Sequence, residues 1–181
     1  MTVPYTRWPD DLATRYRRKG YWLDLPLTDI SDRQRDNPAV AIRDQQTALT
    51  YQQMAVSSDQ LAASLQRAGL KKGDTALVQL ANQCEFYVVF FALLKLGVAP
   101  VNALFSHQRS ELLAYAQQIE PVLLIADRQH PLFQDERFLM QFTQQVPSLR
   151  QVFMHHALPG DQSLADACQY PSENFRPDPS A

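Results

Sequence analysis

Short apolar runs that alternate with longer helical patterns constrain the fold of this chain more than any other feature. Four runs have the length and composition of strands: residues 75–80, 98–102, 122–126 and 151–154. Between them lie segments with apolar residues at helical spacing, including residues 83–96 and 110–119. Strands that alternate with helices form a mostly parallel sheet with helices on its faces. We therefore predict an α/β fold.

Two of the expected helices carry further signals. Residues 50–69 begin with Thr50 and Gln53, which fit the S/T-x-x-E/Q capping box that closes a helix N-terminus. Gly69 can adopt the left-handed conformation that ends such a helix. Residues 83–96 are apolar on nearly every side, so we expect a helix buried between layers. Their apolar stretch falls short of the roughly 20 residues that a membrane span requires, and the N-terminus has no signal-peptide pattern.

We divide the chain into three parts. Residues 1–36 carry two short helical patterns and are predicted to form a helical arm. Five aromatic side chains are expected to fix this arm to the body: Tyr5, Trp8, Tyr16, Tyr21 and Trp22. Residues 37–170 form the predicted α/β subdomain, which starts with a hairpin built from residues 39–42 and 48–50. Residues 171–181 contain three prolines and indicate a linker or a truncated end.

The charge of the chain argues against two classes of partner. The 181 residues include 17 Lys and Arg against 19 Asp and Glu, a formal net charge of -2. This balance lacks the positive field that nucleic acid or an anionic membrane surface requires. Cys84 and Cys168 lie far apart and lack metal-ligand spacing, so we expect reduced thiols and a cytoplasmic protein. A small molecule or another protein is the expected partner.

Familiar catalytic and phosphate-binding motifs are missing from the sequence. The five glycines are scattered, and neither G-x-G-x-x-G nor G-x-x-x-x-G-K-[ST] occurs, so no nucleotide site is predicted. A G-x-S-x-G nucleophile elbow is missing as well. His155 and His156 suggest a metal site, yet neighbours in a strand point to opposite faces and no third ligand stands nearby. We therefore interpret them as exposed loop histidines and predict no metal site.

His107 and Arg109 are the candidate binding residues. They follow the predicted strand at residues 98–102, at the end where ligands bind in open α/β sheets. The alternative interpretation is an ordinary polar loop that leads into the helix at residues 110–119. Position alone leaves both interpretations open.

Two long stretches and two short motifs resemble the adenylate-forming superfamily. The N-terminal stretch reads PYTRWPDDLATRYRRKGYW, and residues 103–133 read ALFSHQRSELLAYAQQIEPVLLIADRQHPLF. The short motifs are Leu49-Thr50-Tyr51 and, at residues 94–101, LKLGVAPV. Together they resemble the 2,3-dihydroxybenzoate-AMP ligases of enterobactin-type siderophore biosynthesis. The resemblance covers the whole chain and implies the N-terminal part of the large domain of such an enzyme.

The resemblance implies a reaction, cofactors and partners for a full-length protein. Such enzymes use ATP and Mg²⁺ to convert an aryl acid to an acyl-adenylate, release pyrophosphate, and pass the acyl group to the phosphopantetheine thiol of an aryl carrier protein. Their phosphate loop, aryl-binding loop and catalytic lysine have no counterpart in this chain. No catalytic or cofactor-binding residue is therefore carried over, and we expect the chain alone to be inactive. By its position near the pantetheine route of the superfamily, the loop with His107 and Arg109 is expected to face the carrier-protein arm.

Two other interpretations remain open. The chain can be a truncated, non-catalytic interaction or dimerisation module that associates through exposed core surface. It can also be an unrelated small α/β binding domain, against which the missing glycine-rich loop argues. The sequence does not decide between dihydroxybenzoate and salicylate as the aryl acid.

Overall fold

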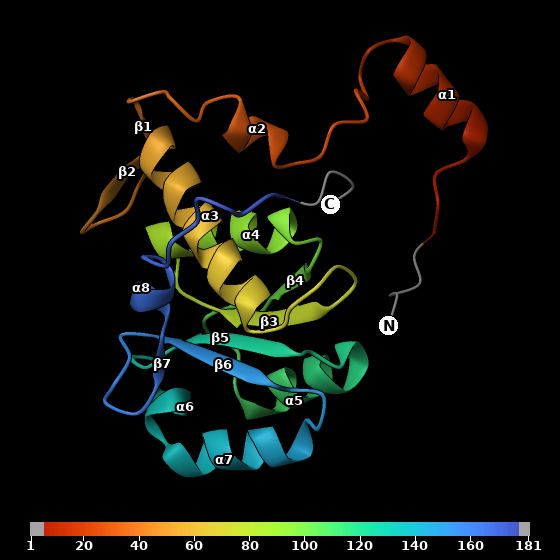
Figure 1. Cartoon of the computed structure of the whole chain (residues 1–181). Helices are drawn as coiled ribbons and strands as arrows, with labels where there is room; N and C mark the ends of the chain where they lie inside the picture. Colours follow the sequence, from red (N-terminus) through yellow and green to blue (C-terminus); the bar gives the residue numbers. More distant parts are fainter. Residues whose placement is uncertain (1–5, 178–181) are drawn as a thin grey trace.

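The computed structural model describes residues 6–177, and a five-stranded parallel sheet forms its centre (Figure 1). The strands follow the order β4-β3-β5-β6-β7, and every neighbouring pair is parallel. Their bounds are β3 (Thr75–Gln79), β4 (Ala99–Asn102), β5 (Leu123–Asp127), β6 (Gln151–His155) and β7 (Gln162–Ser163). The predicted α/β class and its four strands are confirmed. The short strand β7 was outside the prediction.

Helices cover both faces of this sheet (Figure 1). One face carries α3 (Tyr51–Arg67), α4 (Cys84–Lys95) and α8 (Leu164–Ala167), and the other carries α5 (Arg109–Ile119), α6 (Pro131–Gln134) and α7 (Glu136–Gln145). Alternate residues of β5 point to opposite faces: Leu123 packs in the cluster of α3 and α4, and Leu124 in the cluster of α5 and α7. All five residues of β5 are buried. A strand that is covered on both faces has an unbroken run of apolar residues, and this run allowed β5 to be predicted from the sequence.

The hairpin and the capped helix are also as predicted. Strands β1 (Val40–Arg43) and β2 (Ala48–Thr50) pair antiparallel. Thr50 accepts a hydrogen bond from the backbone N–H of Gln53 at 3.1 Å, and the Gln53 side chain accepts one from the N–H of Thr50 at 2.9 Å. Gly69 has φ +92°, a conformation in which a side chain would be strained. These local signals therefore fix both ends of α3.

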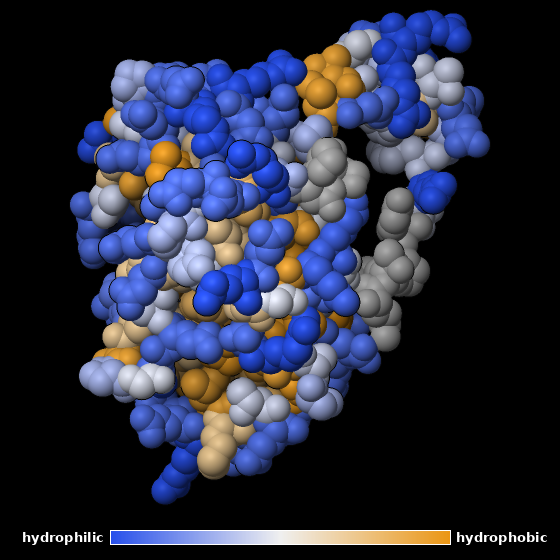
Figure 2. Space-filling model, viewed as in Figure 1, coloured by the Kyte–Doolittle hydropathy of each residue, from blue (hydrophilic) through white to orange (hydrophobic). Residues whose placement is uncertain are grey.

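Helix α4 is only partly enclosed. Val89, Ala92 and Leu93 are buried against α3 and the sheet, while Tyr87 remains 44% exposed and Phe90 is partly exposed. Figure 2 shows hydrophobic residues that reach the surface between polar ones. The predicted burial on every side is thus observed on one side alone. No helix among residues 6–177 is long and apolar enough to cross a membrane.

The N-terminal arm has two unlike segments. Helix α1 (Asp10–Arg18) stands away from the body, whereas α2 (Asp29–Asp32) lies close to α3 (Figure 1). Around α1, the ring of Trp22 lies 5.9 Å from that of Trp8 and 5.4 Å from that of Tyr16, between centroids. These rings pack on one another, and Trp8 remains 57% exposed. The prediction that they fix the arm to the body is wrong for these residues; Tyr5 lies outside the described part.

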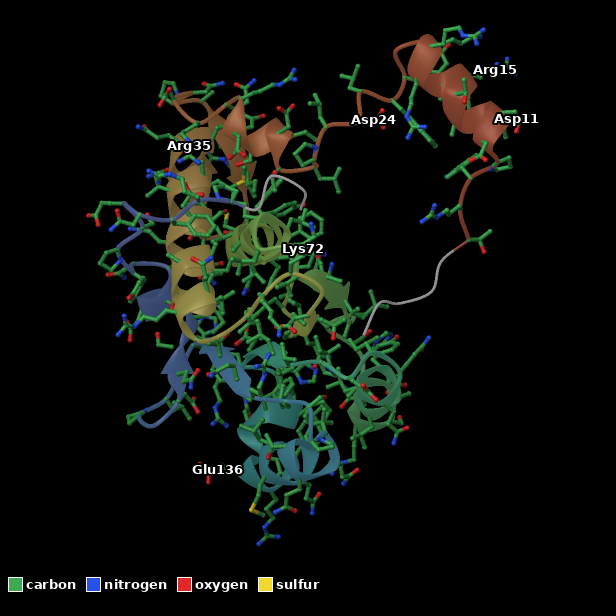
Figure 3. All side chains as sticks on the ribbon, turned by 45° about the vertical axis from the view of Figure 1, so that its right-hand side comes forward. Asp11, Arg15, Asp24, Arg35, Lys72 and Glu136 are labelled. Atoms are coloured by element: carbon green, nitrogen blue, oxygen red, sulfur yellow. The ribbon has the colours of Figure 1, made fainter. Side chains whose placement is uncertain are left out.

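A charge network holds α2 to the body. The ammonium of Lys95, whose side chain is fully buried in α4, lies 2.6 Å from a carboxylate oxygen of Asp59 in α3 and 3.4 Å from one of Asp32 in α2. Arg35 pairs with the other oxygen of Asp59 at 2.7 Å, and Figure 3 shows it beside α3. Side chains from three helices therefore neutralise one another at a single point.

The end of the described chain returns to the core. Phe175 is 7% exposed and belongs to the cluster formed with α3 and α4. Residues 178–181 of the predicted Pro-rich segment lie outside the described residues. The three-part division of the chain into residues 1–36, 37–170 and 171–181 stays a prediction.

Candidate functional site

The strand order places a candidate site at one edge of the sheet. After β4 the chain crosses to the other side of β3 to form β5, so the order reverses between β3 and β5. Open α/β sheets bind ligands outside the carboxyl ends of the strands at such a reversal. The residues at this edge are Gln79 at the end of β3, the loop after β4, Asp127 at the end of β5 and His155 at the end of β6.

The loop after β4 is held against the end of β3. Gln79 is fully buried, and its Nε2 donates hydrogen bonds to the carbonyls of Leu104 and His107, each at 2.9 Å. Phe105 packs edge-on against the His130 ring with centroids 4.8 Å apart. The Oε1 atom of Gln79 has no partner among the described residues. The loop after β4 is thus packed against the end of β3 and against His130.

The structure ties His107 and Arg109 to neighbouring helices. His107 is half-buried, with Nδ1 3.2 Å from the Tyr115 hydroxyl. Arg109 begins α5, donates a hydrogen bond to Oε1 of Gln141 at 2.8 Å and lies 4.7 Å from the centre of the Phe138 ring. Both lie at the predicted carboxyl edge. That they face pantetheine stays a prediction.

A polar cavity of about 600 Å³ opens beside this edge. Its lining comes from the β1–β2 hairpin, the start of α4 and the loops after β5 and β6: Arg43 to Thr47, Asn82, Gln83, Glu85, Gln129, His155 and His156. Among the described residues, neither His107 nor Arg109 lines it. The described lining of the cavity is therefore separate from the predicted loop.

Asp44 organises the hairpin side of the cavity. Its carboxylate accepts hydrogen bonds from the backbone N–H groups of Gln46, Thr47 and Cys84 at 2.6 to 2.9 Å. These donors, Cys84 first, hold the pKa of Asp44 far below its usual range. Cys84 begins α4, so this carboxylate occupies the position at the helix N-terminus where an anion would bind. Sequence reasoning missed this role, because Asp44 and Cys84 are forty positions apart.

His155, His156 and Asp127 converge on the opposite side of the cavity. Asp127 and His155 are partners in the parallel pairing of β5 and β6. His156 has φ +51°, so its ring turns back and lies 3.8 Å from that of His155, between centroids. Nδ1 of His156 is 2.8 Å from Oδ1 of Asp127, which is 2% exposed. The two arguments made from sequence, opposite faces and no third ligand nearby, are therefore both wrong.

Neighbouring groups shift the pKa of His155 and hold the Asp127 carboxylate in place. Burial, and next the adjacent His156, lower the pKa of His155. Asp127 also accepts a hydrogen bond from the backbone N–H of Gln129 at 2.8 Å. The following residue, Arg128, binds Asp161 through two nitrogens, one at 2.7 Å, and so fixes the loop after β6. Arg128 also holds the pKa of Asp161 below its usual range.

Comparison with known proteins gives a consistent result. A family model described as AMP-binding enzyme matches residues 27–179. Enterobactin synthase component E of Escherichia coli is 54% identical over 180 residues, which are 99% of this chain and 33% of that protein. The vibriobactin-specific 2,3-dihydroxybenzoate-AMP ligase of Vibrio cholerae is 33% identical over 85% of this chain and 29% of that protein. The chain thus spans about a third of the length of these relatives.

A solved structure agrees with the sequence relatives. The apo structure of Mycobacterium smegmatis MbtA superposes with a TM-score of 0.83 at 28% identity, over 98% of this chain and 34% of that one. The family resemblance seen in the N-terminal stretch and in residues 103–133 is confirmed.

Proposed function

Because the chain belongs to the family of AMP-binding enzymes, we propose that it forms the N-terminal part of an aryl-acid adenylating enzyme of siderophore biosynthesis. The identity to enterobactin synthase component E along nearly the whole chain carries this proposal. The full-length reaction would convert 2,3-dihydroxybenzoate and ATP to an aryl-adenylate and pyrophosphate. An aryl carrier protein would then accept the acyl group. A cytoplasmic location is part of the proposal, and the free thiols of Cys84 and Cys168 support it.

ATP and Mg²⁺, which the family reaction needs, do not fit the described residues of this chain. The five glycines, each at positive φ, are scattered along the sequence instead of gathered in one phosphate-binding loop. The N-terminus of α4, the helix start beside the cavity, already binds the carboxylate of Asp44. We therefore assign both groups to the rest of a longer protein.

The role proposed for this chain is that of a scaffold. Its sheet and two helix layers supply one wall of the large domain, and the partly exposed side of α4 offers apolar surface to a neighbouring segment. Adenylation replaces a poor leaving group on the acid by AMP, and that chemistry requires donors positioned around the phosphorus. The described part of this chain provides support for such donors rather than the donors themselves.

Exchange of labelled pyrophosphate into ATP tests the proposal. Two proteins are compared: the 181-residue chain, and a chimera in which it replaces the matching third of enterobactin synthase component E. We expect exchange by the chimera with 2,3-dihydroxybenzoate or salicylate, and none by the chain alone. A folded chimera that is inactive with both acids would contradict the adenylating role. Exchange by the chain alone would contradict the scaffold role.

The same chimera tests the loop with His107 and Arg109. If this loop faces the carrier-protein arm, Arg109→Ala slows transfer to the aryl carrier protein and leaves pyrophosphate exchange unchanged. Gln141→Ala is the matched control, because it removes the 2.8 Å partner of Arg109 and keeps the guanidinium. Equal transfer by Arg109→Ala and the parent chimera would remove the proposed role.

A further inference from the structure

We infer that Asp127, His155 and His156 form a binding site for one divalent transition-metal cation of the zinc class. Each residue offers one ligand atom, and the three atoms all lie within 4.8 Å of one another. No part of the adenylation reaction proposed above uses these side chains. The site is therefore a function of this chain in addition to its role as a scaffold.

The backbone brings the three donors together. The parallel register pairs Asp127 with His155, so their Cα atoms are neighbours at the carboxyl ends of β5 and β6. In an extended strand the next residue, His156, would point to the opposite face. Its left-handed backbone, at φ +51°, reverses that direction. A left-handed residue other than glycine is strained and persists only where its surroundings hold it, as the Asp127 carboxylate does here at 2.8 Å.

The donor atoms select the class of cation. Two imidazole nitrogens and one carboxylate oxygen suit Zn²⁺, Co²⁺ and Ni²⁺. Mg²⁺ prefers oxygen ligands and retains water, so this set disfavours the ion that the family reaction requires. The inferred site therefore differs from a nucleotide-bound magnesium in its chemistry.

The distances allow coordination after small side-chain movements. Zinc bonds of about 2.0–2.1 Å in a tetrahedron place the ligand atoms about 3.3 Å apart. The 2.8 Å pair of Asp127 and His156 must open slightly, and the remaining pairs start no more than 4.8 Å apart. The N–H of Gln129 fixes the carboxylate at 2.8 Å, so the exposed His156 ring makes most of the adjustment. A bound cation would take the place of the contact between Nδ1 of His156 and Oδ1 of Asp127.

The fourth coordination position faces the cavity. His155 and His156 line the space of about 600 Å³, whose walls also carry the side chains of Glu85 and Gln129. Glu85 lines the same cavity as His155 and His156, and a carboxylate near the site favours a cation. Three protein ligands with one open position leave room for water or a small anionic ligand.

Titration with Co²⁺ and Zn²⁺ tests the inference on the chain purified without a polyhistidine tag. Co²⁺ should produce the visible bands of four-coordinate cobalt at one ion per chain, and Zn²⁺ should displace it. His156→Asn and His155→Gln should each weaken Zn²⁺ binding by more than about tenfold in calorimetry. Asparagine tolerates the left-handed backbone at position 156, so the variant keeps the local fold. His107→Ala is the control, since it removes an imidazole outside the cavity.

Each outcome decides the inference. Binding of one ion that both cluster variants weaken and His107→Ala leaves unchanged supports it. Failure of Co²⁺ and Zn²⁺ to bind the unaltered chain overturns it. Binding that survives either His155→Gln or His156→Asn, with circular dichroism showing a folded chain, also overturns it.

Discussion

The two helices of the N-terminal arm are held in opposite ways. Around α1, aromatic rings contact one another and the ion pair of Arg17 with Asp24 is exposed on both sides. At α2, Asp32 and Arg35 join a network around the fully buried Lys95. The stability of α1 therefore depends on its local contacts alone, whereas α2 unfolds together with the body. Neighbours in sequence therefore need not belong to the same cooperative unit.

The largest effect is expected where α2 meets the body. Asp59→Asn removes the carboxylate that faces both Lys95 and Arg35 and leaves the buried ammonium poorly compensated. Loss of one partner of a buried pair costs about 3–5 kcal/mol. We expect a loss of that size in the free energy of unfolding, measured by urea denaturation.

Lys95→Met is the matched control for this substitution. It removes the buried charge together with its need for a partner, so it should cost much less than Asp59→Asn. Equal losses for the two variants would contradict the network as the link between α2 and the body, and would point to packing alone.

The next largest effect is expected from acid, which should lower the free energy of unfolding of the body. The pKa values of Asp161, beside Arg128, and of Asp44, which accepts three backbone N–H bonds, are both lowered in the folded state. Folded Asp161 and Asp44 therefore bind protons less readily than in the unfolded chain. Their contribution is complete above about pH 5, declines as the pH falls below the unfolded value of about 3.9, and is lost below the folded pKa.

Chemical denaturation at a series of pH values measures this decline. We expect the free energy of unfolding of the body to fall between about pH 5 and pH 2. Asp161→Asn should reduce the slope, because the variant has no proton to take up at this position. An unchanged slope would show that the pair of Arg128 and Asp161 does not couple folding to pH.

A smaller, local effect is expected in the ring cluster. Trp22 contacts the rings of Trp8 and Tyr16, and pairs of this kind contribute about 0.5–1.5 kcal/mol each. Trp22→Ala should speed hydrogen exchange across α1 and leave the unfolding midpoint of the body unchanged. Phe142→Ala, in the core beneath the sheet, should do the reverse. A shift of the body midpoint by Trp22→Ala would mean that α1 is coupled to the body after all.

The sequence could predict the features that depend on nearby residues, and it could not predict those that depend on contacts between distant positions. The strands and the capped helix depend on spacing within one segment. The period of the apolar residues was enough to predict the strands, and Thr50, Gln53 and Gly69 were enough to predict the ends of the helix. The pairing of Lys95 with Asp59 joins residues 36 positions apart. The cluster at Asp127 depends on strand register and on one left-handed residue, His156. The available signal was a histidine pair next to the end of a strand. We assumed an extended backbone there, and this assumption placed the two rings on opposite faces.

The smallest effect is expected at the exposed ion pair of the arm. Asp24 accepts a hydrogen bond from Arg17 at 2.7 Å, but their side chains are 58% and 50% exposed, and such pairs contribute little in water. Asp24 also has φ +52°, a conformation that asparagine tolerates well and alanine poorly. Asp24→Asn should therefore leave hydrogen exchange in α1 unchanged, while Asp24→Ala should speed it through the backbone. If Asp24→Asn loosens α1 as much as Trp22→Ala does, the ion pair rather than the rings holds this helix.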